Sequence, residues 1–141
     1  MLKRKVYQEL LKWKENTEGK ALCIIGARQI GKTTLIREFG KNEYEHFAEI
    51  NFVTGEKAAS IFNDKLTAET IITNLTAYLQ TPLEPGKTLI LFDEVQECPA
   101  VRSAIKFLVE DGRFDYIESG SLLGVRYKEV RSYPVGFEQI L

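Results

Sequence analysis

The segment that most constrains this chain is a glycine-rich stretch that follows an apolar run and precedes an amphipathic one. The apolar run covers residues 21–25, and the glycine-rich stretch covers residues 26–33 with the spacing G-x-x-x-x-G-K-T. A strand, a loop and a helix in this order direct backbone N–H groups and the positive end of a helix towards an anion. The spacing therefore predicts a phosphate-binding loop, and it leaves open what is done with the phosphate.

Each part of this loop has a predicted role in binding a nucleotide. We expect Lys32 to reach the β- and γ-phosphates, and the hydroxyl of Thr33 to ligate Mg²⁺. Glycines allow the backbone N–H groups of the loop to curl round the phosphate chain. The predicted nucleotide-binding residues of this segment are Gly26, Ala27, Arg28, Gln29, Ile30, Gly31, Lys32, Thr33 and Thr34.

Length and composition restrict the class of protein. The chain has 141 residues, 44% hydrophobic and 28% charged, which is ordinary for one soluble globular domain. Its net charge of −1 gives no argument for nucleic acid as a partner. No apolar run approaches the roughly 18 residues of a membrane span, and the basic start lacks the apolar stretch of a signal peptide. Cys23 and Cys98 cannot form a structural zinc site with one histidine and suit a reducing compartment, so we expect a cytoplasmic protein.

Apolar periodicity predicts an alternation of strands and helices. Such alternation is typical of a parallel sheet that helices cover on both faces. The run after Gly136 reads as the start of a helix, which suggests that residues 1–141 are part of a longer protein. Predicted strands cover residues 21–25, 47–53, 88–92, 114–118 and 129–133, and predicted helices cover residues 3–16, 32–39 (ended by Gly40), 56–63, 67–80 and 99–111.

A second motif, Asp93-Glu94, directly follows the most apolar predicted strand. An acid at the carboxyl end of such a strand faces the phosphate loop, where Asp93 is expected to hold Mg²⁺ through water. A carboxylate one residue further on, Glu94, can orient or deprotonate a water that attacks the γ-phosphate. The pair therefore favours hydrolysis over transfer to a small acceptor. The sequence lacks Asn-Lys-x-Asp, and Gln96 stands where a GTPase has glycine, so ATP is the expected nucleotide.

Three further polar residues follow predicted strands. Ser119 and Ser121 end the fourth strand, where one hydroxyl could contact the γ-phosphate or the attacking water, although a plain Ser-Gly-Ser turn fits equally well. Asn51 ends the second strand and is a weaker candidate. It could hydrogen-bond Glu94 and hold it away from the water until a partner binds, or it could simply cap a turn.

Five segments together resemble a known family. They are residues 26–35, 50–52, 91–96, 119–121 and 133–141, in that order. The chain resembles the AAA+-like prokaryotic ATPases of the AAA_14 type, which usually carry a C-terminal domain of unknown function (the DUF4143 type). The resemblance implies an α/β, three-layer P-loop NTPase fold with a mainly parallel sheet in the order 5-1-4-3-2. It also implies Lys32 and Thr33 as phosphate and Mg²⁺ ligands, Asp93 as the Walker B acid, Glu94 as catalytic base and Ser119 or Ser121 as sensor.

The chain departs from this family at two points. Val135-Gly136 stands where the family usually has Leu-Ser, so a helix-capping serine is lost. We also expect residues 1–141 to stop short of the helical lid and the C-terminal effector domain, which in AAA+-like proteins supply an arginine sensor and much of the oligomer contact. We therefore expect weak ATP binding and slow hydrolysis from the core alone. Arg28 is expected to face solvent or an adjacent subunit, and the arginine-finger candidates, none of them preferred, are Arg102, Arg113, Arg126 and Arg131.

The predicted function is that of an ATPase core over residues 1–141, in which residues 1–20 form an N-terminal helix and turn. Its expected partners are ATP, Mg²⁺, the effector domain and further copies of the chain. The alternative is a nucleotide-gated switch module that binds protein or DNA and in which hydrolysis is slow or absent. A small-molecule kinase is disfavoured by Asp93-Glu94, because that pair suits attack by water.

Overall fold

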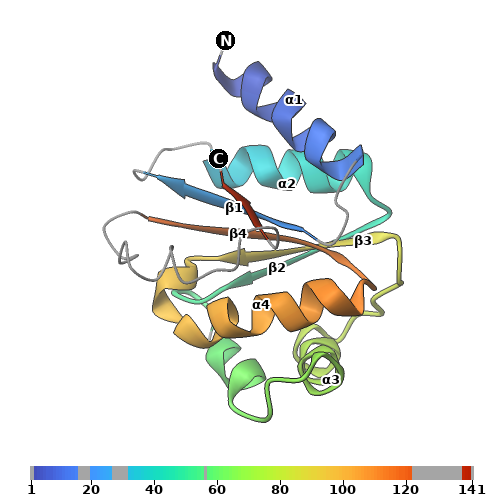
Figure 1. Ribbon diagram of the computed structural model, residues 1–141, viewed down its shortest axis with the longest axis vertical. Coiled ribbons are helices and arrows are strands. Elements are labelled where there is room, and N and C mark those ends of the chain that lie inside the picture. Colours follow the sequence, from blue (N-terminus) through green and yellow to red (C-terminus); the bar gives the residue numbers. More distant parts are fainter. Residues whose placement is uncertain (1, 16–19, 27–31, 56, 122–137, 141) are drawn as a thin grey trace.

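The computed structural model describes residues 2–15, 20–26, 32–55, 57–121 and 138–140 (Figure 1). In these ranges strands and helices alternate as the sequence predicts. Among the described residues, the structure has no helix with the length and apolar character needed to cross a membrane. The elements in order are α1 (Leu2–Glu15), β1 (Ala21–Gly26), α2 (Lys32–Glu43), β2 (His46–Asn51), η1 (Ala58–Phe62), α3 (Ala68–Leu79), β3 (Thr88–Asp93), η2 (Val95–Glu97), α4 (Pro99–Asp111), β4 (Asp115–Ser121) and β5 (Glu138–Ile140).

The strands form one sheet in the order β2-β3-β4-β1-β5, and every neighbouring pair is parallel. Read from the other edge, this is the predicted order 5-1-4-3-2. The strand at the fifth place is, however, a different segment from the predicted one. The predicted strand at residues 129–133 lies outside the described residues, whereas β5 occupies residues 138–140, where a helix was expected.

That helix prediction is wrong for residues 138–140. Glu138 pairs with Ala21 and Gln139 with Leu22 in a parallel register with β1. Without β5, the outer edge of β1 would leave a row of unpaired backbone N–H and C=O groups. Pairing with β1 satisfies these groups, and a helix at residues 138–140 would not.

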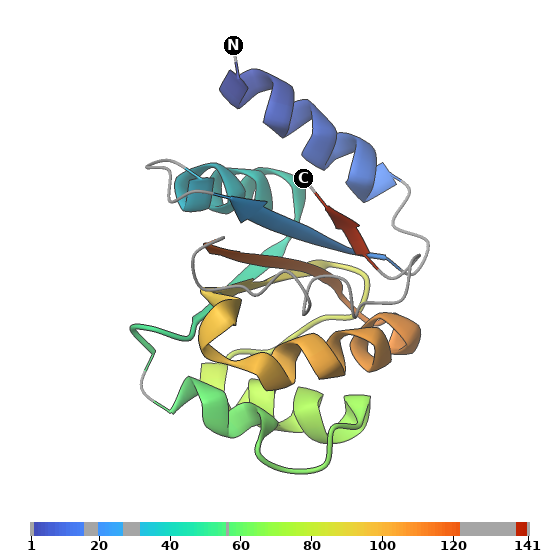
Figure 2. The same ribbon diagram turned by 60° about the vertical axis from the view of Figure 1, so that its left-hand side comes forward.

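Helices cover both faces of the sheet. In Figures 1 and 2, α2 lies on one face with α1 outside it, and α3, α4 and η1 lie on the other face. The buried side chains form two clusters that match these layers. Alternate residues of β3 belong to different clusters: Leu89 and Leu91 face α2, and Ile90 and Phe92 face α3 and α4. This double burial explains why β3 reads as a continuous apolar run.

The prediction that Gly40 ends its helix is also wrong, because α2 continues to Glu43. A Cβ atom added at Gly40 would overlap the ring of Phe47 on β2. The glycine is therefore explained by the close approach of α2 to β2, and not by a helix end.

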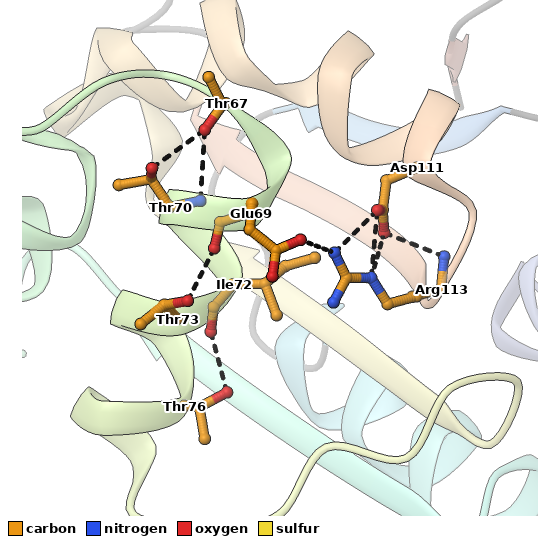
Figure 3. A network of polar contacts seen from close by, with 8 residues as sticks. All are labelled: Thr67, Glu69, Thr70, Ile72, Thr73, Thr76, Asp111 and Arg113. Carbon is orange, nitrogen blue, oxygen red and sulfur yellow. Dashed lines mark hydrogen bonds and ion pairs between the residues drawn. The ribbon is translucent and has the colours of Figure 1, made fainter.

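At the amino end of β4, Arg113 joins α3 to the end of α4 (Figure 3). Its Nε donates to Asp111 Oδ2 at 2.9 Å, and its Nη2 donates to Glu69 Oε2 at 3.0 Å. Thr67 caps the amino end of α3, because its hydroxyl accepts the backbone N–H of Thr70. Arg113 thus makes structural ion pairs at the edge of the sheet opposite to the carboxyl ends of the strands.

Candidate functional site

The predicted site residues gather at the carboxyl edge of the sheet. β1 ends at Gly26 in register with Ser121 of β4, and β3 ends at Asp93 in register with Ser119. Because the strands are parallel, their carboxyl ends share one edge, which is where open α/β sheets bind ligands. The amino end of α2 begins at Lys32, so the residues that follow the predicted loop also reach this edge.

Lys32 is half-buried and directed at the end of β4. Its Nζ donates to the carbonyl oxygen of Gly120 at 2.9 Å. Burial lowers the pKa of Lys32, and the negative charges of Asp93 and Glu94 act in the opposite direction. The structure thus holds one ammonium group close to two carboxylates. The loop residues 27–31, including Arg28, lie outside the described residues.

Asp93 is buried, with its two carboxylate oxygens in different surroundings. Oδ1 accepts the hydroxyl of Ser119 at 2.6 Å and the backbone N–H of Glu94 at 2.9 Å. Oδ2 lies 3.4 Å from the hydroxyl of Thr33 and 3.4 Å from the amide nitrogen of Asn51. The short bonds to Oδ1 fix the orientation of the carboxylate, and this orientation turns Oδ2 towards Thr33.

The donors at this point fit Mg²⁺ bound together with a phosphate. Within the described ranges, no three His, Cys, Asp or Glu side chains gather as a metal site. Mg²⁺ does not need such a cage, because in phosphate-binding sites it uses one or two protein oxygens, phosphate oxygens and water. Oδ2 of Asp93 and the hydroxyl of Thr33 are two oxygens of this kind, placed side by side.

Ser119 is completely buried and donates to Asp93. The contact of Ser119 with the nucleotide stays a prediction, and the partner that the structure gives its hydroxyl is the carboxylate of Asp93. The backbone of Ser121 belongs to β4, but its side chain lies outside the described part of the site.

Asn51 forms the turn that ends β2. Its Oδ1 accepts the backbone N–H groups of Val53 at 2.8 Å and Thr54 at 2.9 Å, and its amide nitrogen faces Asp93. This is the turn-capping alternative, which the structure confirms. The hypothesis that Asn51 holds Glu94 is not supported, because the Asn51 amide is directed at the neighbouring acid.

Glu94 has an unusual backbone conformation. Its φ of 58° and ψ of 46° lie in the left-handed region, which residues other than glycine rarely adopt. Backbone strain of this kind is typical of functional sites. The conformation starts the short helix η2 directly after β3, so the carboxylate of Glu94 leaves the sheet next to Asp93. Its Oε1 accepts the side-chain amide of Gln96 at 2.9 Å.

Sequence reasoning did not identify two parts of this site. From the sequence, Gln96 served only as evidence against a GTPase, and Gly120 was predicted only as the middle of a Ser-Gly-Ser turn. The structure places the Gln96 side chain on Glu94 and over Gly120. The one available signal was the position of Gln96 two residues after Glu94, and a spacing of two does not reveal a contact in an irregular segment.

Two of the arginine-finger candidates, Arg102 and Arg113, belong to the described residues. Arg102 is buried in α4, and Arg113 makes the ion pairs at the opposite edge of the sheet. Arg126 and Arg131 lie outside the described residues. Arg113 thus adds no finger to the site of its own chain.

Comparison with known proteins gives one family and several similar folds. A family model described as "AAA domain" matches residues 18–140. No curated protein matches the sequence significantly. A structure of Drosophila ORC bound to DNA is similar with a TM-score of 0.59 at 9% identity, covering 99% of this chain and 87% of that chain.

Two further solved structures are longer than this chain. Drosophila ORC bound to AT-rich DNA and Cdc6 matches with a TM-score of 0.56 at 10% identity, covering 99% of this chain and 53% of that one. C. elegans PCH-2 matches with a TM-score of 0.57 at 12% identity, covering 99% of this chain and 42% of that one. At such identities the likeness concerns the fold alone, and this chain spans about half of these two proteins or less.

Proposed function

The chain belongs to the AAA domain family of the AAA_14 type, and from this premise we propose that it binds ATP with Mg²⁺ and hydrolyses it to ADP and phosphate. The family supports an ATPase-type nucleotide-binding core. The observation that carries the proposal is the arrangement of Asp93. Two short hydrogen bonds fix its Oδ1, and its Oδ2 faces Thr33 beside the ammonium of Lys32.

In this proposal, Asp93 and Thr33 would hold Mg²⁺, and Lys32 binds the phosphates. When bound, the metal would neutralise negative charge on the phosphate oxygens. Lys32 needs little reorganisation, because the Gly120 carbonyl already holds its ammonium at the carboxyl edge of the sheet. The backbone of residues 26–34 is proposed as the phosphate cradle, with Ser119 and Ser121 as further contacts.

Glu94 is proposed as the catalytic base. It would accept a proton from the water that attacks the γ-phosphate, which is the step that a general base accelerates. Its left-handed backbone conformation and the bond from its own N–H to Asp93 keep its carboxylate next to the proposed metal site. Water is the proposed acceptor, so the products are ADP and inorganic phosphate.

Two substitutions separate binding from hydrolysis. Lys32→Ala is expected to weaken ATP binding and phosphate release together, because it removes the charge that meets the phosphates. Glu94→Gln is expected to abolish phosphate release and to spare ATP binding. Lys12→Ala is the matched control, since Lys12 lies exposed on α1. Unchanged ATP affinity in Lys32→Ala would contradict the proposed binding site, and phosphate release at the parent rate in Glu94→Gln would contradict the proposed base.

The alternative, a nucleotide-gated module that binds DNA or protein, has one finding in its favour. Two of the structurally similar proteins are ORC assemblies bound to DNA. A filter-binding assay of the whole chain with duplex DNA, with and without ATP, tests this alternative. Retention of DNA that depends on ATP would favour the switch module, and equal retention under both conditions would count against it for DNA.

The proposed partners of this core follow from the family resemblance, and its proposed cellular location follows from its cysteines. The family resemblance supports a C-terminal effector domain and further copies of the chain as partners. Cys23 and Cys98 are both buried. A chain with only two cysteines suits a reducing compartment, which supports a cytoplasmic location.

A further inference from the structure

We propose that Gln96 is a positioning residue for Glu94, and that the glycine at residue 120 leaves room for the Gln96 amide beside it. This inference rests on the proposed function, because it concerns how the proposed base is oriented. It starts from the hydrogen bond that Gln96 Nε2 donates to Glu94 Oε1 at 2.9 Å. Both side chains are half-buried, so neighbouring atoms limit their movement.

The backbone that carries both side chains is tied to the core. Residues 95–97 form the short helix η2, in which Val95 is completely buried. The N–H of Glu97 bonds the carbonyl of Glu94 at 3.1 Å, and the N–H of Cys98 bonds that of Val95 at 3.0 Å. The side chain of Gln96 therefore leaves a fixed backbone, and its amide can restrain the carboxylate that it contacts.

Gly120 provides the surface on which the Gln96 amide lies. A Cβ atom at residue 120 would be 2.6 Å from Gln96 Oε1, which is closer than real Cβ contacts. The carbonyl of the same glycine accepts Lys32 Nζ at 2.9 Å. Contacts thus run from the phosphate-binding lysine through Gly120 and Gln96 to Glu94, and a side chain at residue 120 would push the Gln96 amide aside.

The kinetic consequence follows from the geometry that a general base needs. A base acts only within hydrogen-bond reach of the proton that it takes, and its orientation decides whether it has that reach. The Gln96 amide restrains the rotation of the Glu94 carboxylate. Loss of this bond should lower kcat and leave ATP binding intact, because Gln96 acts on Glu94 and not on the nucleotide.

Steady-state ATP hydrolysis by the whole chain tests this with Gln96→Leu, which keeps the size of the side chain and removes its donor. We expect kcat to fall by roughly tenfold to a hundredfold, the scale of a misplacement of about 1 Å. KM for ATP should stay within about twofold, as for a group that acts in the transition state only. Gly120→Ala should give the same split by displacing Gln96. Gln8→Leu is the matched control, because Gln8 lies exposed on α1.

ATP affinity and stability distinguish positioning from a merely structural role. Gln96→Leu should keep the ATP affinity and the free energy of unfolding of the parent, measured by ATP binding and urea unfolding, while its kcat falls. A loss of ATP affinity or of stability that accompanies the fall in kcat, or a kcat equal to that of the parent in Gln96→Leu, would overturn this inference and leave the proposed function standing. A parent kcat in Glu94→Gln, or no hydrolysis by the parent chain, would instead overturn the proposed function and this inference with it.

Discussion

At the scale of single residues, the proposed metal site depends on how the carboxylate of Asp93 is held. Its Oδ1 accepts one hydroxyl and one backbone N–H, so this oxygen is committed to the protein. The other oxygen faces Thr33. A carboxylate with one fixed and one outward oxygen can bind a metal without reorganising, which is the arrangement expected of a preorganised site.

Ser119→Ala tests this arrangement. The substitution removes the shortest bond to Asp93 in a completely buried place, so we expect a loss of about 1–3 kcal/mol in the free energy of unfolding. The Mg²⁺ concentration that gives half-maximal ATP hydrolysis should also rise. Urea unfolding and a Mg²⁺ titration measure the two effects.

Ser103→Ala is the control, because Ser103 is exposed on α4 and its replacement should change stability by less than about 0.5 kcal/mol. A Ser119→Ala variant with the stability and Mg²⁺ dependence of the parent would contradict the role given to Ser119.

A second buried carboxyl, Asp115, predicts a dependence of stability on pH. Burial raises its pKa above the ordinary 3.8, although the Tyr44 hydroxyl donates to it at 2.6 Å and opposes this shift. The folded state therefore binds this proton more tightly than the unfolded state does. The resulting stability is fully present below pH 3.8 and is lost as pH rises through the higher pKa of the folded state.

Asp115→Asn removes this titration. The free energy of unfolding of Asp115→Asn, relative to that of the parent, should therefore increase as the pH rises from the ordinary Asp pKa of about 3.9 towards neutral. Urea unfolding of both proteins across this pH range measures the difference between their free energies of unfolding. Parallel stability curves for the two proteins would contradict the prediction.

At the scale of elements, α1 packs as an integral part of this fold although the family match begins only at residue 18. The α1 side chains of Leu10 and Trp13 are buried, and the Trp13 ring lies 6.5 Å from that of Phe39 on α2. The indole N–H of Trp13 donates to the Lys20 carbonyl at 3.1 Å, which ties α1 to the start of β1. We therefore regard α1 as an additional outer layer that covers α2.

Trp13→Ala measures what this layer contributes. Removal of a completely packed aromatic side chain leaves a cavity, and we expect a loss of about 3–5 kcal/mol in the free energy of unfolding. Urea unfolding followed by circular dichroism gives the value. Lys12→Ala, on the exposed side of the same helix, should stay close to the parent. A loss below about 1 kcal/mol for Trp13→Ala would show that α1 is not part of the folded core.

At the scale of the whole molecule, the sequence predicted the features that local chemistry determines. β3 was found because both of its faces are buried, and α4 because Pro99 stands at its first turn. Lys32 and Asp93 were placed together because parallel strands bring their carboxyl ends to one edge. The prediction failed where tertiary contacts decide. Gly40 continues a helix because Phe47 lies against it, residues 138–140 pair with β1, and Gln96 meets Glu94 across a turn.

The role of Glu94 as base in ATP hydrolysis by this core can be measured in a single turnover. Release of phosphate from Mg²⁺-ATP, with the chain in excess, should be compared between the parent and Glu94→Gln at equal nucleotide occupancy. Phosphate release is expected from the parent and not from Glu94→Gln, although both bind ATP. Release at the same rate by both proteins, or by neither, would contradict this role.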